Sequence, residues 1–231
     1  MPSAKKIFEG QFLHLIALLI LFGGIFAAGR MRGFYTGSLW GISTGTWLFL
    51  LIADTVVHQV YVWFCWRVEL HGGLLTKWFG HRAFRVYAVG FAILISLRPV
   101  LMILLSWSNR GTIPLPPTIT VSLAGIMAIP ALYLLYSVKK YFGFLRAFGL
   151  DHFDPGYRTR ALIKKGIFRF TENGMYYFGL LGLWIPALLF SSIAGIVGAL
   201  FSHLYIWVHF FCTERPDMET IYRPNDHLSL H

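Results

Sequence analysis

The chain has 231 residues, of which 56% are hydrophobic and only 13% are charged. A soluble domain usually carries roughly a quarter of charged residues, so this composition, with a mean hydropathy of +0.61, excludes a water-soluble globule. The formal net charge of +10 does not indicate nucleic-acid binding. The basic residues lie at the ends of apolar runs and form no surface of interleaved basic and aromatic side chains.

Four apolar runs in the first two thirds of the chain are each long enough to cross a bilayer, which takes about 20 helical residues. No linker rich in Pro, Gly or Ser divides the chain, so we expect one membrane domain over residues 1–231. The four runs predict transmembrane helices at about residues 7–28, 39–66, 84–107 and 118–141.

The second and third predicted helices contain polar and charged side chains that would lie within the hydrocarbon of the bilayer. Asp54 and His58 lie one turn apart on one helix face, and Arg98 lies within the next helix. An ionised carboxylate in hydrocarbon costs several kcal/mol, so we expect Asp54 to pair with His58 or with Arg98. These residues form either a structural polar clamp or the lining of a substrate cavity, and the sequence leaves both readings open.

The last apolar block, residues 175–212, is too long for one crossing and is interrupted at Pro186 and at Ser191 and Ser192. We therefore predict a hairpin of two helices, which makes an all-α bundle of about six spans. All but four of the 20 Lys and Arg residues fall in segments on one side of the predicted membrane. Cytoplasmic loops retain positive charge, so this distribution predicts that both termini are cytoplasmic.

A polar connector separates the fourth helix from the hairpin. Residues 148–165 contain Asp151, His152, Asp154 and Pro155, followed by a basic run, and form the largest polar segment on the predicted cytoplasmic side. Loops carry binding and catalytic residues more often than spans do, so we expect a site close to this connector.

Two motifs flank the predicted hairpin. The first is Gly-Ile-Phe-Arg-Phe-Thr-Glu-Asn-Gly-Met-Tyr-Tyr-Phe-Gly at residues 166–179, and the second is Glu-Arg-Pro-Asp-Met-Glu-Thr-Ile-Tyr at residues 214–222. Together they resemble the integral-membrane methyltransferase superfamily, which includes phosphatidylethanolamine N-methyltransferases and isoprenylcysteine carboxyl methyltransferases. The resemblance covers roughly residues 146–223, the last third of the chain.

Three positions depart from the family pattern. Glu172 stands where the family has Arg, Gly174 where it has Pro, and Phe178 where it has Gly, with Gly179 one residue later. Asn173, Met175 and the two tyrosines keep their places. The departures leave open a different substrate, a shifted cofactor or an inactive relative.

The resemblance implies an S-adenosylmethionine site on the cytoplasmic side of an integral membrane protein, with a lipid or other lipophilic acceptor entering from the bilayer. It implies a cofactor-binding portion at residues 148–231 and an acceptor cavity in residues 1–147, lined by Asp54, His58 and Arg98. Because the cations of this cofactor need acidic partners and an amine acceptor must lose a proton, we expect Glu214 and Glu172 to be the catalytic residues. The implied cofactor-binding residues are Asn173, Tyr176, Tyr177, Gly179, His203, Glu214, Arg215 and Glu219. No metal ion is expected, because Cys65 and Cys212 lie in separate apolar runs.

Two other classes of function compete with methyl transfer. A transporter or channel would use Asp54, His58 and Arg98 as an intramembrane polar path. A haem-binding electron carrier would need histidine ligands from His14, His58, His203 and His209, whose spacings show no convincing pairing. A non-catalytic relative of the methyltransferases is the third alternative.

Overall fold

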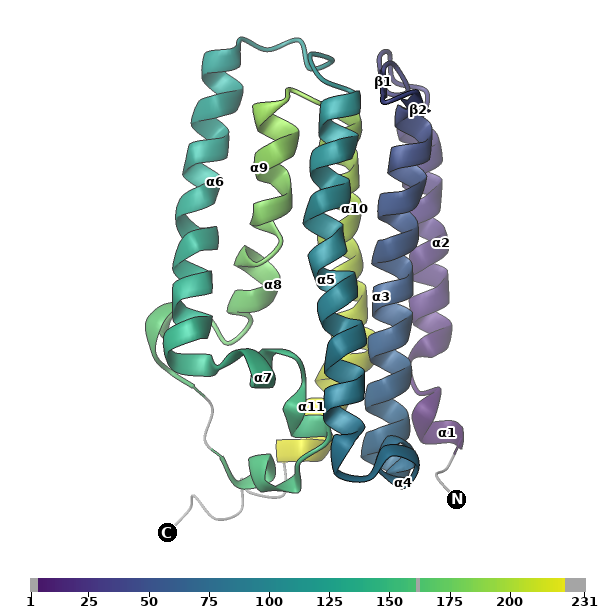
Figure 1. Cartoon of the computed structure of the whole chain (residues 1–231), viewed down its shortest axis with the longest axis vertical. Coiled ribbons are helices and arrows are strands. Elements are labelled where there is room, and N and C mark those ends of the chain that lie inside the picture. The colour runs from purple at the N-terminus through teal and green to yellow at the C-terminus, as the bar shows by residue number, and fades with distance from the viewer. Residues whose placement is uncertain (1–3, 161–162, 223–231) are drawn as a thin grey trace.

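The computed structural model describes residues 4–160 and 163–222. Within these residues the chain is a helical bundle with one two-stranded β ribbon, which confirms the predicted all-α class (Figure 1). Residues 161–162 of the predicted connector and residues 223–231 of the predicted tail lie outside this description. The predicted division of the domain at residues 147 and 148 remains a prediction.

Most of the bundle consists of five long helices joined by short segments. The long helices are α2 (Gln11–Ala28), α3 (Thr44–Gly72), α5 (Ala83–Ser108), α6 (Pro117–Ser137) and α10 (Ile193–His209). The shorter α-helices are α1 (Ala4–Ile7), α4 (Leu74–Phe79), α7 (Phe144–Ala147), α8 (Gly174–Phe178), α9 (Leu181–Leu189) and α11 (Arg215–Tyr222). The remaining elements are the strands β1 (Ser38–Leu39) and β2 (Ile42–Ser43), the 3-10 helices η1 (Gly80–Arg82), η3 (Leu150–His152), η4 (Pro155–Thr159) and η5 (Gly166–Arg169), and the π-helices η2 (Val138–Phe142) and η6 (Phe210–Glu214).

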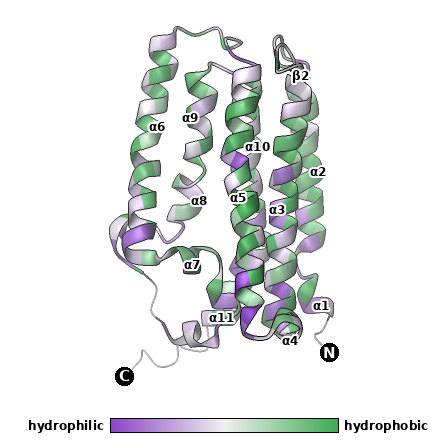
Figure 2. Cartoon of the chain, viewed as in Figure 1, coloured by the Kyte–Doolittle hydropathy of each residue, from purple (hydrophilic) through white to green (hydrophobic). Residues whose placement is uncertain are grey.

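Five described helical stretches are long and apolar enough to cross a membrane, consistent with a polytopic membrane protein. They are Lys5–Ala28, Thr44–Gly72, Leu74–Ser108, Pro117–Phe142 and Ile193–Tyr222. Figure 2 shows hydrophobic residues along these helices and hydrophilic bands that interrupt α3 and α5. Because many large apolar side chains on the outer faces are exposed, those faces suit contact with lipid.

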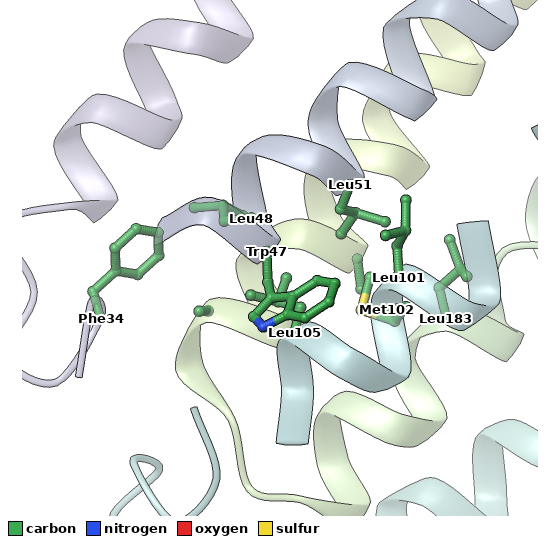
Figure 3. Packing of buried hydrophobic residues seen from close by; sticks show 10 residues of the cluster. Phe34, Trp47, Leu48, Leu51, Leu101, Met102, Leu105 and Leu183 are labelled. Atoms are coloured by element: carbon green, nitrogen blue, oxygen red, sulfur yellow. The ribbon is translucent and has the colours of Figure 1, made fainter. Parts of the chain in front are cut away.

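The main apolar core lies where α3, α5, α9 and α10 pack together (Figure 3). Its buried members come from all four helices and from the segment after α2; they are Phe34, Trp47, Leu48, Leu51, Leu101, Met102, Leu105, Leu183, Ala194 and Ala199. In Figure 1, α6 and α9 lie side by side on the other flank of the bundle. This packing holds the hairpin α9–α10 against α3 and α5.

The second long helix begins later than predicted. It starts at Thr44, and residues 38–43 form the β ribbon instead. Trp40 and Gly41 have φ angles of 56° and 77°, which is the left-handed turn geometry of a tight two-residue hairpin. Ser43 then caps α3, because its side chain accepts a hydrogen bond from the backbone N–H of Thr46. The expected start at residue 39 was therefore wrong.

The predicted hairpin is confirmed between α9 and α10. The chain reverses between Leu189 and Ile193, and the Ser192 hydroxyl caps α10 by accepting a hydrogen bond from the Gly195 N–H. The interruption predicted at Pro186 is wrong, because Pro186 lies inside α9. The apolar stretch Gly174–Leu189 is shorter than the other five, so the count of six spans stays a prediction. The described ends of the chain, α1 and α11, lie at the same end of the bundle (Figure 1).

Asn109 joins three segments at the opposite end of the bundle. Its side-chain amide donates to the backbone oxygens of Gly33 and Thr36 at 2.9 and 2.8 Å. Its Oδ1 accepts from the Ser192 hydroxyl at 3.0 Å and from the Ala194 N–H at 2.9 Å. The side chain is buried, so the segment after α2, the end of α5 and the start of α10 all depend on one amide.

We expect Asn109→Ala to destabilise the folded protein by about 2–4 kcal/mol, because it leaves several buried backbone and hydroxyl groups without partners. Thermal unfolding in detergent measures the effect as a lower Tm. A Tm equal to that of the wild type would show that water or lipid replaces these bonds without cost.

Candidate functional site

Buried Arg67, in α3, joins the N-terminal segment to the last described helix, α11. It lies at the end of the bundle where both described ends of the chain are found. The Arg67 side chain has no exposed surface and its Nε pairs with Oδ1 of Asp217 in α11. Its Nη1 donates to the carbonyl oxygen of Lys6 at 2.7 Å, and its Nη2 donates to those of Cys212 and Thr213 at 3.3 and 3.2 Å. The described part of the second motif, residues 214–222, is therefore held against α3.

The connector contributes a histidine to the same cluster. The ring of His152 is buried, and its Nδ1 lies 3.2 Å from Oδ1 of Asp151 while its Nε2 lies 3.6 Å from Oδ2 of Asp217. The indole of Trp66 stacks on this ring at 4.0 Å between centroids. The connector predicted to lie near a site thus takes part in a buried polar cluster, and its link to Arg67 through Asp217 was not predicted.

A tyrosine in the tail closes the cluster on the other side. The Tyr222 hydroxyl donates to Oδ2 of Asp151 at 2.9 Å and accepts a hydrogen bond from Nη2 of Arg146 at 3.1 Å. Both ends of α11 are thus tied, the first through Asp217 and the last through Tyr222. This explains why Ile221 between them has no exposed surface.

The charges around His152 change its protonation. Burial alone would lower the pKa of His152, but the hydrogen bond with Asp151 and the negative charges of Asp151 and Asp217 outweigh burial and raise the pKa to about 9. Burial would raise the pKa of Asp151, and the contacts with His152 and Tyr222 hold it below its usual value instead. At neutral pH the pair is therefore a charged, buried ion pair.

Glu214 occupies the last position of the π-helix η6, between the two Arg67-bound carbonyls and Asp217. Its side chain is half-buried, and the charges of Asp151, Asp217 and His152 act on it electrostatically. Within residues 4–160 and 163–222 its carboxylate has no hydrogen-bond or ion-pair partner. An unpaired, half-buried carboxylate beside other acids favours a cationic ligand.

The two tyrosines of the first motif pack against the end of α10. The ring of buried Tyr176 lies 4.8 Å from that of Phe210 and 5.5 Å from that of Trp207, between centroids. Exposed Tyr177 contacts Trp207 at 4.8 Å. Because Phe210 begins the π-helix that ends at Glu214, the aromatic motif and the acidic tail meet on one short segment.

The rest of the first motif lies further out. Glu172 and Gly179 are exposed, and Asn173 is half-buried directly before α8. Among the described residues, the Glu172 side chain forms no hydrogen bond or ion pair with the Arg67 cluster. These three residues flank the aromatic part of the site.

His203 and Arg215 occupy positions with local partners. The Trp184 indole donates to Nδ1 of His203 at 3.3 Å across the hairpin. This contact is an interhelical hydrogen bond, and His203 lies about 16 Å from Glu214 along the helix axis. Arg215 and Glu219 face solvent and form a one-turn pair at 3.8 Å.

The predicted intramembrane pairing is confirmed in the interior of the bundle. Nε of Arg98 lies 3.5 Å from Oδ2 of Asp54, and Nη2 of Arg98 lies 2.7 Å from Nδ1 of His58. All three residues are buried. Nη1 of Arg98 and Nε2 of His58 have no hydrogen-bond partner in the described part of the chain. The cluster therefore keeps free donors in an apolar setting.

His209 is a further residue that sequence reasoning underrated. It is 2% exposed, and neither ring nitrogen has a hydrogen-bond partner among the described residues. Its ring lies 5.8 Å from Trp66 and 6.4 Å from His14. It stands one residue before the π-helix, so it lies between the Arg67 cluster and the intramembrane cluster.

Neither the pocket found in the structure nor any metal-binding group among the described residues adds to this site. A pocket of about 300 Å³ at the opposite end of the bundle is lined by Gly37, Ser38, Leu39, Trp107, Ser108 and Arg110, none of them a predicted site residue. In the described part of the chain, no group of three or more His, Cys, Asp or Glu side chains is arranged to hold a metal ion.

Comparison with known proteins agrees with the predicted resemblance. Residues 119–225 match the phospholipid methyltransferase family. A phosphatidylethanolamine N-methyltransferase of Talaromyces marneffei is 33% identical over 114 residues, which are 49% of this chain. The chain covers 11% of the length of that relative. No solved structure matches the chain.

The raised pKa of His152 predicts a stability that falls at alkaline pH. Because its pKa is about 9 in the folded state and near 6.5 when unfolded, its protonation stabilises the fold fully below pH 6.5, on the order of 3 kcal/mol, and this contribution is lost as pH rises through about 9. Tm measured in detergent from pH 6 to pH 10 should fall accordingly.

His152→Gln should flatten the part of this pH dependence between pH 7 and pH 9, whereas the exposed His81→Gln should keep it. An unchanged pH profile in His152→Gln would show that the buried ion pair with Asp151 and Asp217 does not control it.

Proposed function

We propose, from the match of residues 119–225 to the phospholipid methyltransferase family, that the protein transfers a methyl group from S-adenosylmethionine to a lipid or other lipophilic acceptor in the membrane. The observation that carries this proposal is the unpaired, half-buried carboxylate of Glu214, held at the tail by the Arg67 cluster and next to an aromatic wall.

The residues around Glu214 fit S-adenosylmethionine. The cofactor carries a sulfonium, an ammonium, a carboxylate and an adenine ring. The Glu214 carboxylate would hold a cation, and the rings of Tyr176, Tyr177 and Trp207 offer aromatic faces for the sulfonium or the adenine. The two free nitrogens of buried His209 can hydrogen-bond a polar group. We assign Asn173 and Gly179 to the rim of this site, and Arg215 and Glu219 to its solvent side.

Bound there, S-adenosylmethionine would supply a methyl group that its positive sulfur already activates. The protein then has to align the acceptor with that methyl group and exclude water. For an amine acceptor, Glu214 would also take the proton that the nitrogen loses, whereas a carboxylate acceptor needs no base. Exposed Glu172 is the second candidate for this role. We assign His203 to hairpin packing, because Trp184 occupies its Nδ1.

The intramembrane cluster suits the acceptor. Because Arg98 donates to Nδ1 of His58, the neutral ring carries its proton on Nε2, which is then a free donor beside the free Nη1 of Arg98. The charges of Arg98 and Asp54 cancel. Two free donors with no net charge favour an uncharged oxygen group of a lipophilic molecule.

The same cluster supports a second candidate function, a transporter whose path runs through Asp54, His58 and Arg98. The observation in its favour is the buried ion pair near the middle of α3 and α5, which an apolar bundle does not need for stability. Transport by protein in liposomes, without methyl transfer, would support this alternative.

We expect Glu214→Gln to weaken S-adenosylmethionine binding by about 10-fold to 100-fold, because it removes a charge-assisted contact worth about 1.5–3 kcal/mol. Calorimetry or filter binding with detergent-purified protein measures the affinity, and methyl transfer to a lipid extract measures turnover. Asp154→Asn in the connector is the matched control, because that exposed side chain keeps the Oδ1 that accepts from the Gly156 N–H. Wild-type affinity and turnover in Glu214→Gln would remove Glu214 from the site.

The double variant Asp54→Leu with Arg98→Met tests the acceptor cavity. Replacing both charges leaves no uncompensated ion, so we expect the protein to fold and to bind S-adenosylmethionine as the wild type does. The KM for the lipophilic acceptor should rise by at least about 10-fold, because the acceptor loses one or two hydrogen bonds. An unchanged KM for the acceptor would show that the cluster is a structural clamp.

A further inference from the structure

The segment that carries Glu214 is a single π-helical turn. Residues Phe210–Glu214 form η6 between α10 and α11, so the chain adds a residue to the turn before the helix resumes. Such π-helical turns store irregular geometry and often occur at functional sites. A turn of this kind needs outside contacts to keep its shape, since its own hydrogen bonds are weaker than those of an α-helix.

Arg67 supplies contacts on both sides of Glu214. Its Nη2 donates to the carbonyl oxygens of Cys212 and Thr213, the two residues before Glu214. Its Nε pairs with Asp217, three residues after Glu214. The guanidinium is planar, so these bonds fix the direction of the turn as well as its distance from α3.

Residues 6–11, from the end of α1 to the start of α2, contact the same turn and Arg67. Nη1 of Arg67 donates to the carbonyl oxygens of Lys6 and Glu9, and the Gln11 amide donates to the Thr213 hydroxyl at 3.2 Å. Gly10 has a φ of 78°, and a Cβ built there would lie 2.5 Å from the carbonyl oxygen of Cys212. A larger residue at position 10 would therefore push the turn away.

We propose that Arg67 and the Gly10 turn are positioning elements that hold the π-helical turn so that the Glu214 carboxylate meets the cofactor. This inference rests on the proposed function. Neither residue touches the cofactor in this arrangement; each acts through the backbone of residues 212–214. The N-terminal segment, which shows no motif in the sequence, thereby becomes part of the site.

Gly10→Ala tests the proposal, and Gly41→Ala is its control. The two glycines have φ angles of 78° and 77°, so alanine adds the same backbone strain at both positions. At Gly41 a Cβ meets no described atom within 4 Å, and the residue lies in the β ribbon at the opposite end of the bundle. Any effect beyond shared strain therefore comes from contact with Cys212.

Two measurements on the whole 231-residue chain are needed. The first is the affinity for S-adenosylmethionine, which Gly10→Ala should weaken by about 10-fold or more while Gly41→Ala leaves it unchanged. The second is the rate at which maleimide modifies Cys212, assigned by peptide mass, which should rise several-fold only in Gly10→Ala. The second readout does not depend on the cofactor, and buried Cys65 serves as the internal reference.

The outcomes separate the two proposals. If the wild type binds S-adenosylmethionine and Gly10→Ala matches Gly41→Ala in both measurements, the positioning role is overturned and the proposed function stands. If the wild type does not bind the cofactor, the proposed function fails and the positioning role fails with it. Should Gly10→Ala not fold, Thr213→Val removes only the bond from Gln11, and it should weaken binding by about 2-fold to 5-fold; unchanged binding would overturn the proposal.

Discussion

The burial of one guanidinium, that of Arg67, organises the cytoplasmic end of the proposed topology. Removing a cation from water costs several kcal/mol, and only full pairing offsets this cost. Arg67 reaches that state through one carboxylate and four backbone oxygens contributed by the N-terminal segment, the π-helical turn and α11. These partners come from both ends of the described chain. If residues 212–217 left α3, Arg67 would lose its carboxylate and two of its backbone partners and would remain as a poorly paired buried charge.

α3 connects this cluster with the second charged site of the bundle. Asp54 and His58 lie on the same helix as Arg67, and nine residues separate His58 from Arg67, which is about 14 Å of helix. Buried His209 stands between the two sites on α10, with both ring nitrogens unpaired among the described residues. In the proposed function, the site around Glu214 binds the methyl donor, and the intramembrane cluster of Asp54, His58 and Arg98 binds the lipophilic acceptor.

Much of the architecture could be predicted because it follows from local composition. Apolar runs of spanning length gave the long helices, Ser191 and Ser192 marked the hairpin, and the cost of a charge in hydrocarbon predicted the pairing of Asp54 with Arg98. The start of α3 was missed because Leu39, Trp40 and Ile42 were read as the first apolar positions of the helix, although Gly41 and Ser43 among them allow a turn and a cap.

The candidate site was only partly predictable, because its contacts join residues far apart in the sequence. Arg67 counted as one of many cytoplasmic charges, since nothing in the pattern links it to Asp217, 150 residues later. Asp151 and His152 attracted attention as part of a polar connector, but their partners did not. The motif tyrosines were recognised from the family resemblance, whereas the π-helical turn that relates them to Glu214 has no sequence signature.

An experimental structure of this chain with S-adenosylhomocysteine bound is the most direct test of the central claim, that Arg67 anchors residues 212–217 so that Glu214 meets the methyl donor. The predicted result is a ligand amino or sulfur group within about 3–4 Å of the Glu214 carboxylate, with the pairing of Arg67 and Asp217 intact. A ligand bound away from Glu214, or a tail that has left Arg67 in the bound state, would contradict it.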